Sequence, residues 1–373
     1  MYRSFGTVLV ILFVLQSSSR GDSPVVAVRS QAPFPPIVAA EEDPAGEETV
    51  LEVLRGDFHI HTPHSDGRVS PEGRVLEAWR YGYDVIAITD HGNFHAYEEA
   101  KPHAEALGLL LLRGIETGIA GQEHIVALDF AADYEPRNPH RWAETEDQEN
   151  VFYQEQMQRL ADAGGYMLYA HPHVGLREPM LWAIERGLLR GIEVKNDVVG
   201  QRWNTVESHG TWWSPFALDW ALEHDLAVFA NSDIHGTRGE ESQAVTLLLV
   251  EERSVSGVVD AIEANRTIAH FNGMLCAREE LLDLMIQNLV EVTTAGEAEG
   301  RHKIQVANRG PIPLEATVGM EGESETVLKL DAFESLLIGW DEPLSEVDIV
   351  WTNLWVSSED NLQTTHRLGS GDE

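Results

Sequence analysis

The sequence contains very little cysteine and very little lysine. Its one cysteine, Cys276, excludes an intramolecular disulfide framework and a zinc site built from several thiolates. Because its neighbours in the sequence are mostly apolar, we expect Cys276 to be a small buried hydrophobic residue. Lysine occurs at only four positions, so the basic residues are mostly arginine.

Positive charge is also scarce relative to negative charge. The 373 residues include 26 Lys and Arg against 62 Asp and Glu, and the formal net charge is −36. A protein with this charge is repelled by the phosphate backbone of nucleic acids and by anionic membrane surfaces. We therefore expect no long nucleic acid and no membrane among its partners. A hydrophobic content of 43% nevertheless indicates a globular protein rather than a disordered acidic chain.

Long apolar runs are absent except for one near the N-terminus. The stretch TVLVILFVL (residues 7–15) follows Arg3 and is too short to span a bilayer comfortably, which is typical of a signal-peptide core. We expect a signal peptide over residues 1–21 and an exported protein, periplasmic or extracellular; an uncleaved N-terminal anchor is the alternative. Residues 22–50, rich in Pro, Ala and acidic side chains, are predicted to form a linker.

Short apolar runs alternate with amphipathic stretches from residue 51 to residue 277. The expected strands are 57–61, 85–89, 109–115, 124–129, 166–170, 191–195, 226–231 and 244–250. The expected helices are 71–82, 95–107, 147–164, 177–189, 214–225 and 255–265. This alternation favours parallel strands covered by helices, and seven or eight such units favour closure into a barrel. Residues 278–373 instead show short alternating runs, which predict a small antiparallel β domain.

Histidine is concentrated in the predicted barrel, with 13 of the 16 histidines between His59 and His235. Five groups lie on or directly after expected strands: Asp57-Phe58-His59-Ile60-His61 with Asp66, Thr89-Asp90-His91, Glu116 with His124, His171-Pro172-His173, and Asp233-Ile234-His235. The C-terminal ends of barrel strands share one rim, so these side chains are expected to meet there. Imidazole and carboxylate are the ligands of ions such as Zn, Mn and Fe. The sequence therefore predicts a metal site at this rim.

These groups resemble the motifs of the PHP (polymerase and histidinol phosphatase) family of metal-dependent phosphoesterases. The resemblance rests on DFHIHTPHSDG (57–67), ITDH (88–91), Glu116, AHP (170–172) and NSDIH (231–235). Looser patterns at 74–84, 191–196 and 266–271 are similar to exported bacterial PHP phosphodiesterases, which carry a small C-terminal β module. The resemblance implies a distorted (β/α)7 TIM-like barrel over residues 51–277, followed by the small antiparallel β domain.

The resemblance also implies a trinuclear centre of three divalent metal ions, which are Mn, Zn or Fe. The first ion would be held by His59, His61, Glu116 and Asp233. Glu116 would bridge to the second ion, whose other ligands would be His124 and His171. The third ion would be held by Asp66, His91 and His235.

The activity implied by the resemblance is hydrolysis of small organic phosphate diesters by a hydroxide that bridges metal ions. Arg177 is predicted to bind phosphate oxygens, and His173 to protonate the leaving alcohol. Alternatives are a phosphate monoesterase, a carbamate or carboxylic ester hydrolase on the same centre, and a non-catalytic binding module. The sequence is compatible with a monomer or a homo-oligomer and does not distinguish between them.

Three tryptophans in the segment 200–214 have two possible roles. Trp203, Trp212 and Trp213 would form either a lid on the barrel rim or a packing surface for the C-terminal module.

Overall fold

A computed structural model of the chain describes residues 31–42, 48–119, 123–136, 140–141, 145–172, 175–198, 205–208, 210–239, 244–298, 300–319, 326–341 and 344–368. The predicted signal peptide lies outside these ranges. None of the helices in the described ranges is both long enough and apolar enough to cross a membrane.

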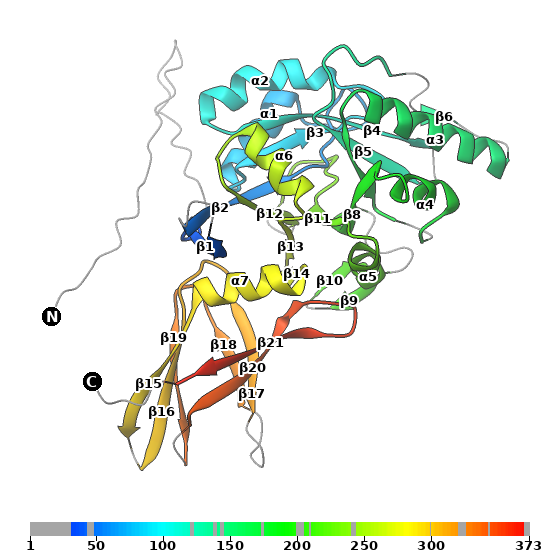
Figure 1. Cartoon of the computed structure of the whole chain (residues 1–373). Helices are drawn as coiled ribbons and strands as arrows, with labels where there is room; N and C mark the ends of the chain where they lie inside the picture. The colour runs from blue at the N-terminus through cyan, green and yellow to red at the C-terminus, as the bar shows by residue number, and fades with distance from the viewer. Residues whose placement is uncertain are drawn as a thin grey trace, which may run out of the picture.

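The larger part of the protein is an α/β unit (Figure 1). Its strands are β1 (Ile37–Glu42), β2 (Glu48–Asp57), β3 (Val85–Ile88), β4 (Leu110–Ile119), β5 (His124–Leu128), β6 (His140–Arg141), β7 (Tyr166–Ala170), β8 (Leu189–Asn196), β9 (Val206–Ser208), β10 (Thr211–Trp213), β11 (Ala227–Asn231), β12 (Val245–Val250), β13 (Thr267–Phe271) and β14 (Met274–Cys276). Its helices are α1 (Pro71–Arg80), α2 (His95–Leu107), α3 (Glu146–Asp162), α4 (Glu178–Ile184), α5 (Pro215–Glu223) and α6 (Val255–Glu263).

Hydroxyl side chains fix where several of these helices begin. A serine or threonine directly precedes each of α1, α3, α5 and α6: Ser70, Thr145, Ser214 and Ser254. In each case the side-chain oxygen accepts a hydrogen bond from the backbone N–H of the residue three positions later. Such caps satisfy an N–H group that the helix itself leaves without an acceptor. The expected helices are therefore all present, with ends that differ by a few residues.

The main sheet mixes parallel and antiparallel strands in the order β11-β8-β7-β5-β4-β3-β2-β12-β13-β14. The pairs β2–β3, β3–β4, β7–β8 and β8–β11 are parallel, whereas β5 is antiparallel to both β4 and β7, and β12 is antiparallel to β2 and β13. The expectation of parallel strands throughout is therefore wrong at β5 and β12. Only residues 120–123 separate β4 from β5, and a parallel pair needs a crossover of a dozen residues or more.

The sheet curves so that its edge strand β11 lies against β12 and β13, which are near the other end of the strand order. Within the described ranges no ladder pairs β11 with either strand. The hydroxyl groups of Thr246 and Thr267 instead accept hydrogen bonds from the backbone N–H groups of Ala230 and Val228, each at 3.1 Å. A closed barrel is therefore not confirmed, and side chains form the seam where a closed barrel would have a ladder.

The first strand lies within the predicted linker. β1 pairs antiparallel with β2, and Ile37 is fully buried. The N–H of Val38 also donates to Asn288 Oδ1 at 2.8 Å. Residues 37–42 are thus a strand rather than linker. The sequence shows no alternation of apolar and polar residues here, because this edge strand is held mainly by backbone hydrogen bonds.

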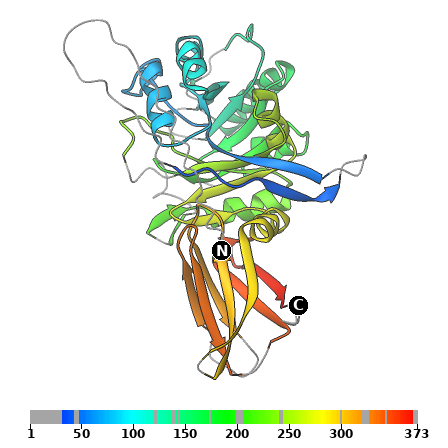
Figure 2. The same cartoon turned by 90° about the vertical axis from the view of Figure 1, so that its left-hand side faces the viewer.

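A smaller β module follows α7 (Glu279–Leu289), and it extends away from the α/β unit (Figures 1 and 2). Its strands are β15 (Val290–Ala298), β16 (Arg301–Asn308), β17 (Leu314–Gly319), β18 (Thr326–Leu330), β19 (Ser335–Trp340), β20 (Glu346–Trp355) and β21 (Asn361–Arg367). One sheet is β15-β16-β19, and β17, β18, β20 and β21 form the other. Every pair within the module is antiparallel, which confirms the β region predicted after residue 278.

The β module is joined to the α/β unit by strand pairing and by aromatic packing. β14 pairs with β20 in parallel, and the Trp213 ring centroid lies 5.5 Å from that of Trp355 and 5.9 Å from that of Phe271. Trp213 therefore packs against the C-terminal module, as one of its two predicted roles required. Cys276 is fully buried at this junction, as expected. Trp203 lies outside the described residues.

Candidate metal centre

The first two histidines lie just beyond the end of a strand. β2 ends at Asp57, four residues earlier than the expected strand 57–61, and Ile60 then forms an isolated bridge with Ile234. The extended backbone keeps the alternation of a strand. Phe58 and Ile60 are buried in apolar clusters, and His59 and His61, which alternate with them, lie in the centre.

Unusual backbone conformations bring other side chains into the centre. His171 follows β7 with φ 28°, and Asp233 lies just after β11 with φ 50°. Positive φ is uncommon for residues other than glycine and is concentrated at functional sites. Gly67 serves a related purpose, because a Cβ atom there would lie 2.4 Å from the carbonyl oxygen of His61. Only glycine allows the loop 62–67 to approach His61 this closely.

Glu116 lies at the middle of the centre, near the end of β4. One of its oxygens, Oε2, is 3.2 Å from both His59 Nε2 and His61 Nε2. Asp233 Oδ1 lies 3.4 and 3.0 Å from the same two nitrogens. His59, His61 and Asp233 thus offer three potential ligand atoms within 4.8 Å of one another. Glu116 Oε2 lies beside both of these histidines and is also 3.0 Å from His91 Nδ1.

The other oxygen of Glu116 faces a second set of side chains. Glu116 Oε1 lies 2.7 Å from His124 Nδ1 and 3.2 Å from His171 Nε2. Because its two oxygens face different histidines, Glu116 occupies the position expected of a bridging carboxylate.

Asp66 marks the third part of the centre and is the most exposed of the nine residues. Its carboxylate lies 3.2 Å from His235 Nε2 and 3.6 Å from nitrogens of His91 and His61. Among the described residues, four groups offer potential ligand atoms that lie within 4.8 Å of one another: His61, Asp66, His91 and His235; His59, Glu116 and His171; His59, His61 and Asp233; and His91, Glu116 and His124. The structure therefore brings all nine predicted residues together, and His59, His61, His91 and Glu116 each belong to two groups.

Opposite charges compensate each other inside this centre. Burial disfavours the charged forms of His59 and His61, but the neighbouring carboxylates outweigh it, so that the pKa of His59 is well above its usual value and that of His61 is raised to about 9. Burial also disfavours the charged form of Glu116, yet the histidines hold its pKa well below its usual value. The Glu116 carboxylate is therefore ionised and attracts positive charge.

The donor atoms fit divalent cations. Although they are buried, His59 Nε2, His61 Nε2 and Glu116 Oε2 have no hydrogen-bond partner within the described parts of the chain. Buried polar atoms almost always have partners, and a bound ion is one of the groups that satisfy such exceptions. Imidazole nitrogen and carboxylate oxygen are the ligands that ions such as Zn, Mn and Fe prefer.

Three further carboxylates, to which the sequence analysis gave no role, support the centre. Asp90 accepts hydrogen bonds from the N–H and the hydroxyl of Thr62, at 2.7 and 2.6 Å. Asp57 accepts one from Arg238 Nη2 at 2.6 Å. Glu193 lies 2.9 Å from His59 Nδ1. All three lie within motifs visible in the sequence, whereas nothing near Arg238 in the sequence indicates its partner.

The two predicted catalytic residues have different outcomes. His173 lies outside the described residues. Arg177 Nη2 donates to Glu149 Oε2 of α3 at 2.6 Å. This ion pair competes with the predicted binding of phosphate by Arg177, which stays a prediction.

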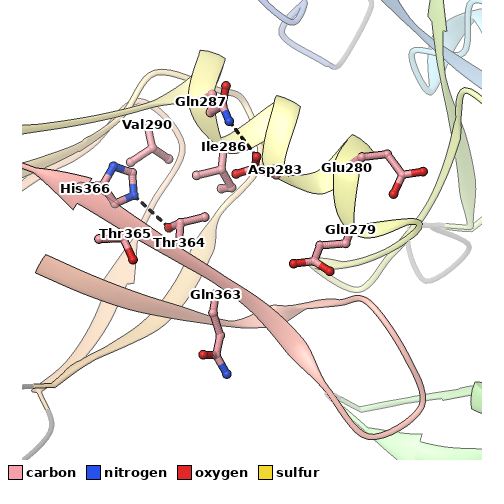
Figure 3. Close-up of a pocket in the computed structure, with 10 residues that line it drawn as sticks. All are labelled: Glu279, Glu280, Asp283, Ile286, Gln287, Val290, Gln363, Thr364, Thr365 and His366. Atoms are coloured by element: carbon pink, nitrogen blue, oxygen red, sulfur yellow. Dashed lines mark hydrogen bonds between the residues drawn. The ribbon is translucent and has the colours of Figure 1, made fainter. Parts of the chain in front are cut away.

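A separate groove lies between α7 and β21 (Figure 3). It has a volume of about 740 Å³, and its lining includes Glu279, Glu280, Asp283 and His366. Figure 3 shows that the His366 ring forms a hydrogen bond with the Thr364 hydroxyl and is not turned toward the acidic side chains of α7. Because none of the nine centre residues lines the groove, it is not part of the candidate metal centre.

Comparison with known proteins relates part of the α/β unit to a described family. Residues 57–173 match the family described as PHP domain. This stretch of the chain is therefore similar to a PHP domain. The resemblance read from the motifs is thereby confirmed, and the match includes every predicted metal ligand except Asp233 and His235.

Curated proteins and a solved structure extend this comparison. A 5′-3′ exoribonuclease from Haemophilus influenzae is 38% identical over 77 residues, which are 20% of this chain and 28% of that protein. A PolC-type DNA polymerase III from Halalkalibacterium halodurans is 32% identical over 99 residues, covering 23% of this chain and 7% of the polymerase. The chain thus spans well under half the length of these relatives.

The solved structure covers both parts of the chain. It is a two-domain protein from Bacteroides vulgatus that contains a predicted PHP-like metal-dependent phosphoesterase. The two chains superpose with a TM-score of 0.71 at 22% identity, over 91% of this chain and 99% of the other. At this identity the likeness shows the fold, in which a PHP-like α/β unit is combined with a second domain.

Proposed function

We propose that the protein is a metal-dependent phosphoesterase that hydrolyses small organic phosphate diesters. The observation that carries the proposal is the position of Glu116, whose two carboxylate oxygens face separate sets of histidines within a cluster of nine potential ligands. Such a centre suits several divalent cations held side by side. The PHP domain match and the phosphoesterase named in the two-domain structure support this reaction class.

The chain's own residues prepare the centre for an anionic substrate. When bound, clustered divalent cations lower the pKa of water and neutralise phosphoryl oxygens. Glu116 and Asp233 supply buried negative charge, and Asp66, His91 and His235 lie nearest to solvent. Substrate would therefore enter beside Asp66, while His59 and Glu116 hold the deep side of the centre.

The choice of a small substrate rests on charge. A net charge of −36 opposes the approach of long polyanions, but it opposes a small ester far less. Exoribonuclease activity is the second candidate, because a 5′-3′ exoribonuclease is one of the matched relatives. Monoester and carbamate hydrolysis on the same centre remain alternatives to be measured.

A substrate panel tests the proposal. Purified protein loaded with Mn²⁺ or Zn²⁺ is expected to hydrolyse bis(p-nitrophenyl) phosphate and to lose this activity with a chelator. The same preparation is compared by kcat/KM on p-nitrophenyl phosphate, an aryl carbamate and a short single-stranded RNA. A fully metallated but inert protein would overturn the proposal, and a higher kcat/KM on RNA would favour the exoribonuclease.

Asp233→Asn provides the matched loss-of-function control. Asparagine tolerates the positive φ of this position, so the substitution removes charge without straining the backbone. We expect kcat/KM to fall by more than about 100-fold, since loss of even an outer partner of a metal ligand typically costs 10- to 100-fold. Circular dichroism should be unchanged, and full activity would refute the metal assignment of Asp233.

A further inference from the structure

Glu193 is a carboxylate buried beside the metal centre, in the second half of β8. Only 1% of the residue is exposed. Unlike Glu116 and Asp233, it does not belong to any of the four groups of potential metal ligands in the described residues. Its role must therefore come from its hydrogen bonds.

Both oxygens of Glu193 are fully engaged. Oε1 lies 2.9 Å from His59 Nδ1 and accepts a hydrogen bond from Asn231 Nδ2 at 2.9 Å. Oε2 accepts from the backbone N–H of His171 at 2.7 Å and from Asn196 Nδ2 at 3.0 Å. Four donors thus saturate the four lone-pair positions of one carboxylate.

These contacts join two potential ligands that come from distant parts of the chain. A carboxylate can only accept, so His59 must carry a proton on Nδ1, which directs Nε2 toward Glu116 and Asp233. At His171 the bond is to the backbone, where φ is 28°. It therefore holds in place the strained turn that aims this side chain at Glu116.

We propose that Glu193 is a positioning residue that fixes the tautomer of His59 and the backbone of His171 for metal binding. The inference rests on the proposed function, in that these histidines hold divalent cations. Asn231 extends the arrangement, because its Oδ1 accepts from the N–H of Phe58 at 2.9 Å and so connects β11 to the segment that carries His59.

Glu193→Gln separates this role from simple space filling. The amide has nearly the same shape but offers one acceptor and one donor in place of two acceptors. If its nitrogen faces His59, the proton of His59 moves to Nε2, which then cannot bind a cation. If its nitrogen faces the other way, the N–H of His171 loses its acceptor. Either orientation impairs one potential ligand.

Two further variants serve as comparisons. Glu193→Asp keeps both acceptors on a side chain that is one methylene shorter, so it should retain more metal affinity than Glu193→Gln. Asp84→Asn is the matched control, because Asp84 is also a buried carboxylate and accepts from the Arg55 N–H at 2.9 Å. It lies just before β3, at the end of that strand opposite the centre. The control should lower Tm and leave metal affinity unchanged.

The experiment measures Zn²⁺ and Mn²⁺ dissociation constants by competition with a chromogenic chelator, alongside metal content and the Tm of metal-free protein. For Glu193→Gln we expect affinity to fall 10- to 100-fold, the usual effect of losing such a partner. Unchanged affinity in Glu193→Gln, or an equal loss in Asp84→Asn, would overturn the inference.

The same measurements distinguish this inference from the proposed function. Wild-type protein that binds metal but hydrolyses no ester overturns only the proposed function. Wild-type protein that binds no divalent cation overturns both proposals.

Discussion

The carboxylates around the centre divide into two kinds according to the partners of their oxygen atoms. Asp57, Asp90 and Glu193 accept strong hydrogen bonds from the surrounding chain, which occupies their lone pairs. Glu116 instead leaves Oε2 buried without a hydrogen bond in the described structure, directed at nitrogens of three histidines. Hydrogen bonding thus separates supporting carboxylates from potential metal ligands, although both kinds lie in the same motifs.

A histidine outside the centre makes stability depend on pH. Burial, together with Arg55, lowers the pKa of His270 to about 4. The unfolded chain binds a proton near pH 6.5, so this contribution to stability is present above that pH and is lost as pH falls toward 4. Between pH 7 and pH 5 the loss is at most about 2 kcal/mol, because the interval reaches only about 1.5 units below the unfolded-state pKa and each unit corresponds to about 1.4 kcal/mol.

Urea unfolding of wild-type and His270→Leu protein at pH 7 and pH 5 checks this expectation. The variant should lose less stability than the wild type over this interval, since leucine does not titrate. Equal losses in the two proteins would show that His270 does not contribute.

At the scale of elements, the seam beside β11 depends on two threonine hydroxyls in place of a ladder. Thr246 Oγ1 accepts from the N–H of Ala230 at 3.1 Å and donates to its carbonyl oxygen at 3.0 Å. This seam lies directly before Asn231 and Asp233, so it also positions the late strand end that carries part of the centre.

Thr246→Val keeps the shape of the side chain but leaves the buried N–H of Ala230 without its acceptor. We expect the free energy of unfolding to fall by about 1–3 kcal/mol, the cost of an unsatisfied buried group. Thr246→Ser retains the hydroxyl and should lose less. Urea unfolding measures both variants, and a valine variant as stable as the wild type would mean that another acceptor serves Ala230.

For the whole molecule, bound cations should raise thermal stability. The nine potential ligands come from strand ends between residues 59 and 235, so a cation that contacts them ties together segments far apart in the chain. Binding only to the folded state adds about 2.7 kcal/mol at a free concentration of 100 times Kd. A chelator should therefore lower Tm by a few degrees, and Zn²⁺ or Mn²⁺ should restore it.

Differential scanning calorimetry of chelated and reloaded protein measures this change. Asp233→Asn should show a smaller metal-dependent shift than the wild type. An identical Tm with and without metal would contradict cation binding at the centre.

The sequence by itself determined most of the helices and strands and the composition of the centre. Apolar period and capping residues act within a few positions of the chain, so helices such as α2 and strands such as β7 agree with the expected bounds. The histidine and carboxylate motifs also lie at strand ends, where short local patterns reveal them.

Only the tertiary structure decided the direction of β5 and β12, the threonine seam, and the strand at residues 37–42. It also decided that Arg177 pairs with Glu149 and that Glu193 joins His59 to His171. Each of these features depends on contacts between residues distant in sequence, whose formation is set by packing and hydrogen-bond satisfaction across the whole chain. Local patterns identify the residue types of a metal centre, whereas the fold selects which carboxylates are left with oxygen atoms available to a cation.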